Sequence, residues 1–320
     1  MTAQTLEINR PDTLATARRG LACILDGPES AGRPEDAAAH SRRQNFENWF
    51  SLHGAGFMRQ VVAMDGSRMI SACLWTQSPG RTALFYSTNI SRYPDAREAA
   101  RGCIAQAAAH ARTEGMVLAQ TILDADNQGS AAVFREAGFR DLADLYYMDR
   151  NAPLFLPRPA PPEGISLWPY RPELEHVFAT TIFATYRDTR DCPKLAGLRS
   201  MTDVMAGHKA VGEFAPALWS LVRRGEDWVG VVLLAAHVNP ASLEVVYLGL
   251  IPEARGCGIG GFLMRHVLQT LVQRRLPQCI LAVDQANVAA LKLYKKARFR
   301  ITGERSVLIL PLNSPGKSGS

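Results

Sequence analysis

The feature that most constrains the fold is an internal repeat. Four pairs of similar residues lie 160 positions apart: Asp124 and Asp284, Asn127 and Asn287, Phe134 and Tyr294, and Phe139 and Phe299. The expected last strands keep this offset, since LYYMD lies 160 residues before the apolar stretch that begins at Arg305. A constant offset of this length indicates two copies of one fold. With 320 residues, of which 47% are hydrophobic, the chain has enough material for two cores.

A proline-rich segment, residues 151–164, separates the two copies. It holds five prolines and can continue neither a helix nor a central strand. We therefore expect domains at 1–150 and 165–311, with this segment as linker and 312–320 as a flexible tail. Apolar periodicity and turn residues predict the order β-α-β-β-β-α-β-α-β for each domain, an α+β fold around a central mixed sheet.

The loop IPEARGCGIGGF, residues 251–262, follows an expected strand and has glycines at four of six consecutive positions. The glycines allow close approach of backbone N–H groups, and the following helix would direct the positive end of its dipole at an anion. The loop matches GxGxxG, but IPEAR separates the glycines from the strand and three strands precede it, which disfavours a dinucleotide-binding domain. A tight turn without a ligand is the remaining alternative.

The second half of the chain resembles the GCN5-related N-acetyltransferases (GNAT superfamily). The run from Arg255 to Gly260 is similar to the family's (Q/R)xxGx(G/A) loop, and a strand and a proline precede it as they do there. Downstream, the residues Asn287, Ala290, Leu293, Tyr294 and Phe299 match the family segment NxxAxxLYxxxGF. One departure is Arg298, which stands where the family has glycine at a helix end.

The resemblance implies acetyl-CoA as acyl donor, direct transfer to an amine, and no metal. It implies that the backbone of Leu248, Gly249 and Leu250 binds the pantetheine arm and that Asn287 contacts it. It also implies that the loop binds the pyrophosphate through Arg255, Gly256, Cys257, Gly258, Ile259, Gly260 and Gly261. The catalytic candidates are Glu244 as base and Tyr294 as the acid that protonates the leaving thiolate.

Each candidate also has a structural interpretation. Glu244, in an apolar strand, shares a face with Leu250 if the strand is regular, but a surface ion pair with an arginine is the alternative. Tyr294 could be a core tyrosine, and Asn287 an ordinary N-cap. Tyr247 would lie on the opposite face from Glu244, in the core, unless a β-bulge intervenes. The side chain of Cys257 is taken as incidental, and the histidines, His208 and His237 among them, show no metal-ligand spacing.

The first half lacks the loop. Asp95 stands 160 residues before Arg255, no glycine cluster surrounds it, and the matching strand TALFYST has no carboxylate. Arg92, Arg97 and Arg101 could hold a phosphate, but solvated surface arginines are the preferred interpretation. We expect this half to be a degenerate, non-catalytic domain, as in members of the family with two tandem domains of which the second is active.

The acceptor is expected to bind near residues 184–215, a long, charged, turn-rich segment in which Asp188, Asp191 and Asp203 could attract an amine. Small-molecule amines and protein amines both remain open. A CoA-binding sensor or scaffold without turnover is the alternative function. The net charge of +6 is spread thinly, which disfavours a nucleic-acid partner. No membrane segment or signal peptide is expected, so we expect a cytoplasmic protein with reduced cysteines, and a homodimer is left open.

Overall fold

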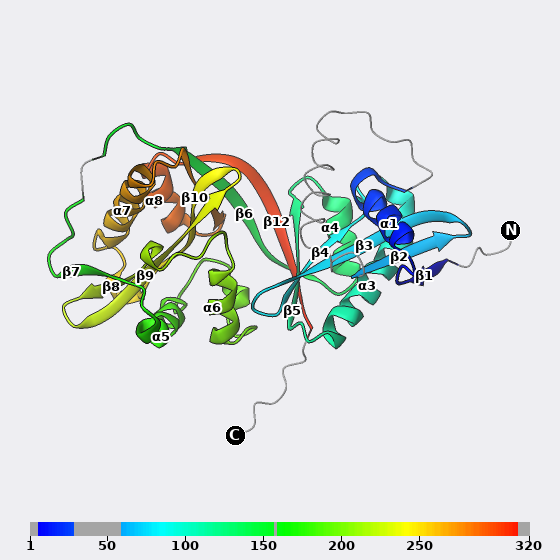
Figure 1. Ribbon diagram of the computed structural model, residues 1–320, viewed down its shortest axis with the longest axis horizontal. Helices are drawn as coiled ribbons and strands as arrows, with labels where there is room; N and C mark the ends of the chain where they lie inside the picture. Colours follow the sequence, from blue (N-terminus) through cyan, green and yellow to red (C-terminus); the bar gives the residue numbers. More distant parts are fainter. Residues whose placement is uncertain (1–5, 29–58, 157–158, 313–320) are drawn as a thin grey trace, which may run out of the picture. The chain divides into compact units, whose positions relative to one another are not determined.

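The computed structural model describes residues 6–28, 59–156 and 159–312. The chain divides into two compact units, Met1–Leu142 with Ser306–Ser320, and Ala143–Arg305. The expected element order is confirmed in both copies of the repeat, and the second copy also contains a helix, α6 (Met201–Lys209), that the expected order does not include (Figure 1). None of the described helices is both long enough and apolar enough to cross a membrane.

The first unit is a mixed sheet in the order β1-β2-β3-β4-β5-β12, in which β4 and β5 are parallel, while β1 with β2, β2 with β3, and β3 with β4 are antiparallel. Its helix α3 packs on β2 and β3 and closes a core rich in small alanine side chains. Its elements are β1 (Glu7–Asn9), α1 (Leu14–Asp26), β2 (Gln60–Asp65), β3 (Arg68–Ser78), β4 (Thr82–Ser87), α3 (Arg97–Thr113), β5 (Leu118–Asp124), α4 (Gln128–Glu136) and the end of β12 (Arg300–Pro311).

The second unit is a sheet in the order β6-β11-β10-β9-β8-β7, in which β10 and β11 are parallel. Its elements are β6 (Arg140–Asn151), β7 (Ile165–Pro169), α5 (Glu175–Thr185), α6 (Met201–Lys209), β8 (Trp219–Arg224), β9 (Asp227–Val238), β10 (Ala241–Leu250), α7 (Ile259–Gln273), β11 (Gln278–Asp284) and α8 (Val288–Lys296). The additional helix α6 lies inside the segment 184–215 and is capped by Ser200, whose side chain accepts a hydrogen bond from the Asp203 N–H.

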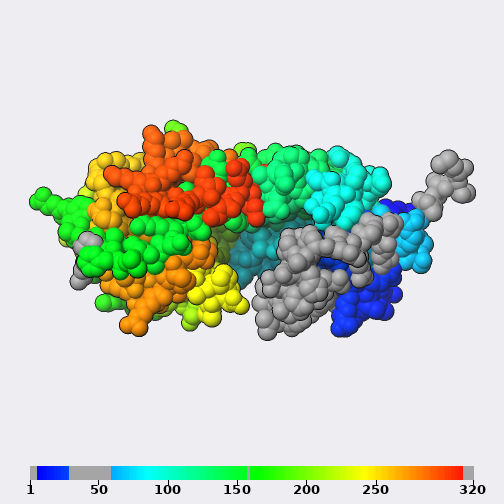
Figure 2. Space-filling view, turned by 90° about the horizontal axis from the view of Figure 1, so that it is seen from above, coloured from blue at the N-terminus to red at the C-terminus, as the bar shows by residue number. Residues whose placement is uncertain are grey.

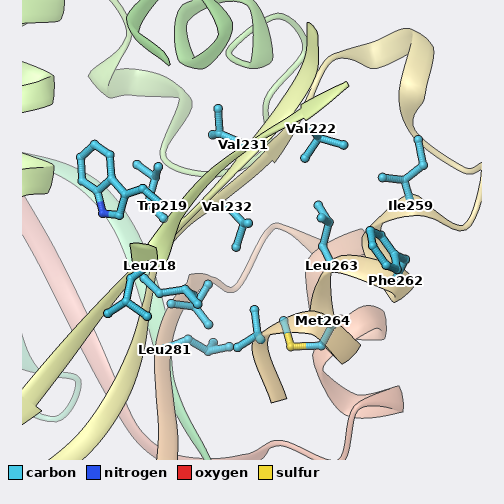
Figure 3. Close-up of a cluster of buried hydrophobic side chains, with 14 of the residues drawn as sticks. Leu218, Trp219, Val222, Val231, Val232, Ile259, Phe262, Leu263, Met264 and Leu281 are labelled. Atoms are coloured by element: carbon cyan, nitrogen blue, oxygen red, sulfur yellow. The ribbon is translucent and has the colours of Figure 1, made fainter. Parts of the chain in front are cut away.

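Helices cover both faces of this sheet. On one face, Val222 and Val232 pack toward Ile259 and Leu263 of α7 (Figure 3). On the other face, the Trp219 ring lies 6.0 Å from the ring of Phe178 in α5. The sheet is therefore hydrophobic on both faces, as its apolar strands predict.

The two units exchange their last strands. Leu145–Asn151 of β6 pair with β11 of the second unit, whereas Leu308 and Leu312 are buried in the core of the first. The Leu312 N–H donates to the Val117 carbonyl at 2.9 Å. The units therefore divide at 142/143 and 305/306 and not at the proline-rich segment. The two strands occupy equivalent places in the repeat, which makes this exchange compatible with one fold for both copies.

The proline-rich segment lies on the surface of the second unit, where residues 152–156 and 159–164 are drawn in green (Figure 2). Leu154 and Phe155 are 105% and 80% exposed. Of the expected tail, only Leu312 belongs to the described residues.

Candidate active site

The glycine loop leads into α7, whose second and third residues, Gly260 and Gly261, have no side chains. Gly256 and Gly258 have φ values of 77° and 81°, and Gly258 is the N-cap of α7. A Cβ at either position would meet nothing within 4 Å, so the backbone conformation, not a lack of space, requires glycine. The helix has no side-chain cap and no acid in its first turn. Its first amides therefore have neither an intrahelical partner nor an acidic side chain within the first turn, which suits an anion.

The Arg255 side chain supports this loop from the protein side. Its guanidinium donates to the carbonyls of Leu250, Thr185, Arg187 and Asp188 at 2.8–3.1 Å. These bonds tie the end of β10 to the end of α5. Because these contacts engage the side chain, Arg255 would bind the cofactor through its backbone. That role stays a prediction. Cys257 is exposed, and its Sγ lies 3.5 Å from the Arg255 carbonyl oxygen.

The edge of β10 toward β11 is open beyond Glu244. Within the described residues, the two strands pair only at Leu243 with Cys279 and at Glu244 with Ile280, while β10 continues to pair with β9 as far as Leu250. The Ile251 N–H donates to Val229 of β9. Since hydrogen-bonding directions alternate along an antiparallel strand, the backbone groups of Leu248 and Leu250 point to the open edge. The edge offers polar groups to an extended ligand, and the glycine loop follows it directly.

A β-bulge in β10 decides which side chains share a face. Val245 pairs with Leu234 and Tyr247 with Leu233, so Val246 is the extra residue. The expectation that Glu244 shares a face with Leu250 is therefore wrong, as is the placement of Tyr247 opposite Glu244. Instead, Glu244, Tyr247 and Gly249 lie on the face covered by α5 and α6.

The Tyr247 side chain is fixed on this face. Its hydroxyl lies 2.7 Å from Oγ1 of Thr185, and the ring of His208 in α6 lies 5.5 Å from its ring at an angle of 31°. Gly249 makes room for it, because a Cβ there would come within 2.7 Å of the tyrosine ring. Burial raises the pKa of Tyr247, and the hydrogen bond from Thr185 opposes the rise. The phenol thus keeps its proton.

Glu244 is hydrogen-bonded to a histidine. The His237 Nε2 atom lies 2.6 Å from its Oε2 atom, and both side chains are 28% exposed. A carboxylate can only accept, so the imidazole N–H is the donor. Gly212, after α6, lies against the histidine, since a Cβ there would come 3.1 Å from its Cε1 atom. The arginine partner weighed for Glu244 is not what the structure shows.

Tyr294 and Asn287 belong to α8. Tyr294 is 7% exposed and packs with Phe299 at a ring distance of 6.0 Å. Burial raises its pKa well above the usual range, and the charge of Asp191 adds to the rise. Asn287 is the N-cap, and its side-chain oxygen accepts from the Ala290 N–H at 3.2 Å.

The segment 184–215 brings Asp191 against Asp284, the last residue of β11. The Cys192 N–H donates to Oδ2 of Asp284 at 3.0 Å, and the Asp284 N–H to Oδ1 of Asp191 at 3.4 Å. Burial raises the pKa of Asp191, the hydrogen bond from the Asp284 N–H opposes the rise, and the charge of Asp284 adds to it. Asp203 instead accepts from the Ser200 hydroxyl at 2.7 Å, and Asp188 contributes its carbonyl to Arg255. Of the three aspartates proposed for the acceptor, Asp191 is the one whose charge acts on the pKa of Tyr294.

Sequence reasoning missed the environment of His208. Its Nε2 atom is buried without a hydrogen-bond partner among the described residues. Burial lowers its pKa to about 4, and the positive charge of Arg199 contributes. The imidazole is therefore neutral at pH 7, beside the Tyr247 ring.

The corresponding region of the first unit is bridged by side-chain hydrogen bonds. Leu84, paired with Gln120, stands where Glu244 pairs with Ile280, and no bulge interrupts β4. The Thr121 hydroxyl donates to the Phe85 carbonyl at 3.1 Å, bridging β5 and β4. The Ser130 hydroxyl accepts from the Ile90 N–H at 2.9 Å, which holds α4 against the loop after β4. Arg97 and Arg101 pair with Glu136 and Glu98, so both already have acidic partners.

Comparisons with known proteins agree with this geometry. Residues 183–299 match the acetyltransferase (GNAT) family. The mycothiol acetyltransferase of Streptomyces bingchenggensis is 32% identical over 165 residues, which cover 50% of this chain and 51% of that protein. The mycothiol acetyltransferase of Thermomonospora curvata is 29% identical over 246 residues, covering 77% and 71%. The chain thus spans about half the length of the first relative and more of the second.

Two solved structures share the fold over nearly the whole chain. A GCN5-related N-acetyltransferase from Sphaerobacter thermophilus has a TM-score of 0.57 at 17% identity and covers 97% of this chain and 96% of that one. A tandem GNAT protein from the clavulanic acid biosynthesis pathway has a TM-score of 0.52 at 15% identity and covers 98% and 100%. The chain therefore carries a domain of the acetyltransferase (GNAT) family at residues 183–299.

Proposed function

We propose that the chain is an acetyl-CoA-dependent N-acetyltransferase that transfers an acyl group to a primary amine, with the chemistry in the unit Ala143–Arg305. The observation that supports this most is the continuity of the open β10 edge with the glycine-rich start of α7. An extended, amide-containing arm suits the edge, and a pyrophosphate suits the helix start. The residues present thus fit CoA along its length.

The cofactor would supply an activated thioester. The backbone groups of Leu248 and the N–H of Leu250 would bind the pantetheine arm, and the amides from Gly256 to Gly261 the pyrophosphate. Asn287 would contribute to cofactor binding by fixing the start of α8, which it caps. Neither set of contacts uses a metal ion.

Two side chains would move protons. Glu244 is partly exposed at the point where β10 and β11 separate, so its carboxylate can take the proton from the acceptor ammonium and leave a nucleophilic amine. Tyr294 keeps its proton because burial raises its pKa, and it would donate that proton to the departing thiolate. The base lies on the α5 and α6 face, while the acid comes from α8.

The acceptor would be a small-molecule amine related to mycothiol. The curated relatives are named for mycothiol acetylation. Glu244 and the pair of Asp191 and Asp284 place negative charge around the site, which favours a cationic amine. An amine on a protein is the other acceptor class.

The first unit would have a structural role. It lacks a carboxylate at the position of Glu244, and Thr121 and Ser130 bridge the place where the second unit is open. One molecule of CoA should therefore bind per chain.

Calorimetric titration with acetyl-CoA and thiol-release assays with an amine panel test the proposal. The panel contains glucosamine, cysteine, spermidine and a peptide with a free N-terminus. Replacing the base, Glu244→Gln, should lower kcat by about 10²- to 10⁴-fold with the CoA affinity unchanged. The control is Glu226→Gln, at the exposed β8–β9 turn, which should remain active. Tight CoA binding without turnover of any amine, and unaltered in Glu244→Gln, would instead favour a sensor or scaffold.

A further inference from the structure

The exchanged strand β6 brings residues from before the proline-rich segment onto the face of the sheet that carries Glu244. Ile280 of β11 pairs with Glu244 on one side and with Asp149 of β6 on the other. Ala282 pairs with Tyr147 in the next row. Directly paired residues, and residues two apart along a strand, point to the same face. The side chains of Tyr147 and Asp149 therefore lie on the Glu244 face.

Within the described residues, the side chains on this part of the face are more exposed than those beneath α5. α5 packs on β9 and β10, where Val231 and Leu233 are fully buried. By contrast, the side chain of Ala282 on β11 is exposed, and Tyr147 is only partly buried. Since neighbouring strands lie about 4.8 Å apart, the strands of Glu244 and Tyr147 are about 10 Å apart, and β11 lies between them, with Ile280 beside Glu244 and the small Ala282 beside Tyr147. The base and the tyrosine thus flank an open strip of sheet.

Two residues of β12 contact Tyr147, one at its backbone and one at its ring. Its carbonyl accepts from the Thr302 hydroxyl at 3.2 Å, and the Arg305 guanidinium lies 5.4 Å from its ring centroid. Burial raises the pKa of its phenol, Arg305 opposes the rise, and the negative charge of Glu244 adds to it. The hydroxyl is therefore protonated at neutral pH and can both donate and accept.

The repeat does not explain this tyrosine. The residue 160 positions later is Val307, which is 2% exposed. The position that is a buried valine in the first unit is therefore a partly exposed tyrosine in the second unit. The second unit also contains Glu244 and the glycine loop.

We propose that Tyr147 binds the acceptor, with its ring as a wall and its hydroxyl as a hydrogen-bonding group opposite Glu244. An amine at Glu244 would then lie with its polar body across Ala282 and against Tyr147. This inference rests on the proposed function, because it concerns the acceptor of that reaction. It makes the first half of the chain a contributor to the acceptor site even though its own copy of the fold is bridged at the corresponding place.

Steady-state kinetics of the full chain test it, with whichever panel amine gives the highest turnover. Tyr147→Leu should raise the acceptor KM about tenfold, the effect of removing an aromatic and hydrogen-bonding contact. Tyr147→Phe keeps the packed ring and should give a smaller rise. The Kd for acetyl-CoA should not change in either variant. Thermal unfolding of both variants checks that they are folded.

Tyr146→Phe is the matched control. Tyr146 is the adjacent residue on the same strand, pairs with Val283 and packs on the opposite, core-facing side. Its substitution should leave the acceptor KM unchanged. If the wild type is active and both Tyr147 variants have the same acceptor KM as the wild type, the inference is wrong while the proposed function stands. Absence of wild-type turnover with every amine would overturn the proposed function, and the inference with it.

Discussion

The His237 Nε2 atom lies 2.6 Å from the Glu244 Oε2 atom, across the hairpin that joins β9 to β10. His237 pairs with Ser242 and Glu244 with Ala235, so the contact is diagonal between adjacent strands. The histidine therefore fixes the carboxylate toward the hairpin and leaves its second oxygen for other partners.

Removing this partner should slow catalysis without abolishing it. A hydrogen bond to a charged group contributes about 1.5–3 kcal/mol, so His237→Ala should lower kcat about tenfold or more by misplacing Glu244. The acetyl-CoA Kd should stay as in the wild type. His176→Ala, on the exposed side of α5, is the control. Wild-type kcat in His237→Ala, combined with an inactive Glu244→Gln, would show that the carboxylate is positioned without the histidine.

Glycine substitutions in the loop should weaken cofactor binding. Gly258→Ala forces a Cβ into a conformation with φ of 81°, at a cost of about 1–2 kcal/mol, and obstructs the start of α7. We expect the Kd for CoA in calorimetry to rise about tenfold or more, as for loss of a charge-assisted hydrogen bond. Gly225→Ala carries comparable strain, with φ of 58° in the β8–β9 turn and open space around it. It should lose stability with no change in Kd, and equal Kd values for the two variants would refute the assignment of the loop.

Stability should fall on acidification because His208 is buried as the neutral form. Its pKa is about 4 in the folded protein against 6.5 for the free side chain. Between these values the unfolded chain binds more protons, so stability rises with pH and is lost as pH falls from 6.5 to 4. The contribution is about 3 kcal/mol. Urea unfolding at several pH values should show this loss in the wild type and not in His208→Phe. The same pH dependence in both proteins would contradict it.

The C-terminus of α8 should be improved by restoring glycine. Arg298 has φ of 64°, a conformation that costs a side-chain-bearing residue about 1–2 kcal/mol. Burial lowers the pKa of the nearby Arg150, and the charge of Arg298 adds to this effect. Arg298→Gly relieves this strain and should raise the free energy of unfolding by about 1 kcal/mol. The greater conformational entropy of glycine in the unfolded chain reduces this gain. Arg300→Gly, two residues on in β12, should lower it. Urea denaturation distinguishes the two, and a less stable Arg298→Gly would show that the arginine makes contacts worth more than its strain.

Local patterns predicted most of the fold. The repeat and the apolar periodicities gave the element order, and the glycines of IPEARGCGIGGF marked the start of α7. These features depend on neighbouring residues, which a sequence displays directly. The helix α6 was not anticipated, although Ser200 and Asp203 provide a capping pattern before Met201.

The unpredicted parts depend on contacts between distant residues. Nothing local distinguishes β6 from β12, since equivalent strands of a repeat can replace each other. The extra residue Val246 reverses the faces of Tyr247 and Leu250, and the sequence VVYLGL does not show a bulge. The contact between His237 and Glu244 was accessible in principle, because a turn at NPAS brings these residues to adjacent strands.

The strand exchange has a consequence for how the protein is made. The sheet of the first unit is completed by Ser306–Leu312, which the ribosome adds only after the whole of the second unit. Domains of most proteins fold in the order in which they are synthesised, from the N-terminus onward. Here the earlier unit must wait with one strand position vacant, and nascent chains halted before Ser306 should remain dependent on chaperones that shield the exposed edge of β5.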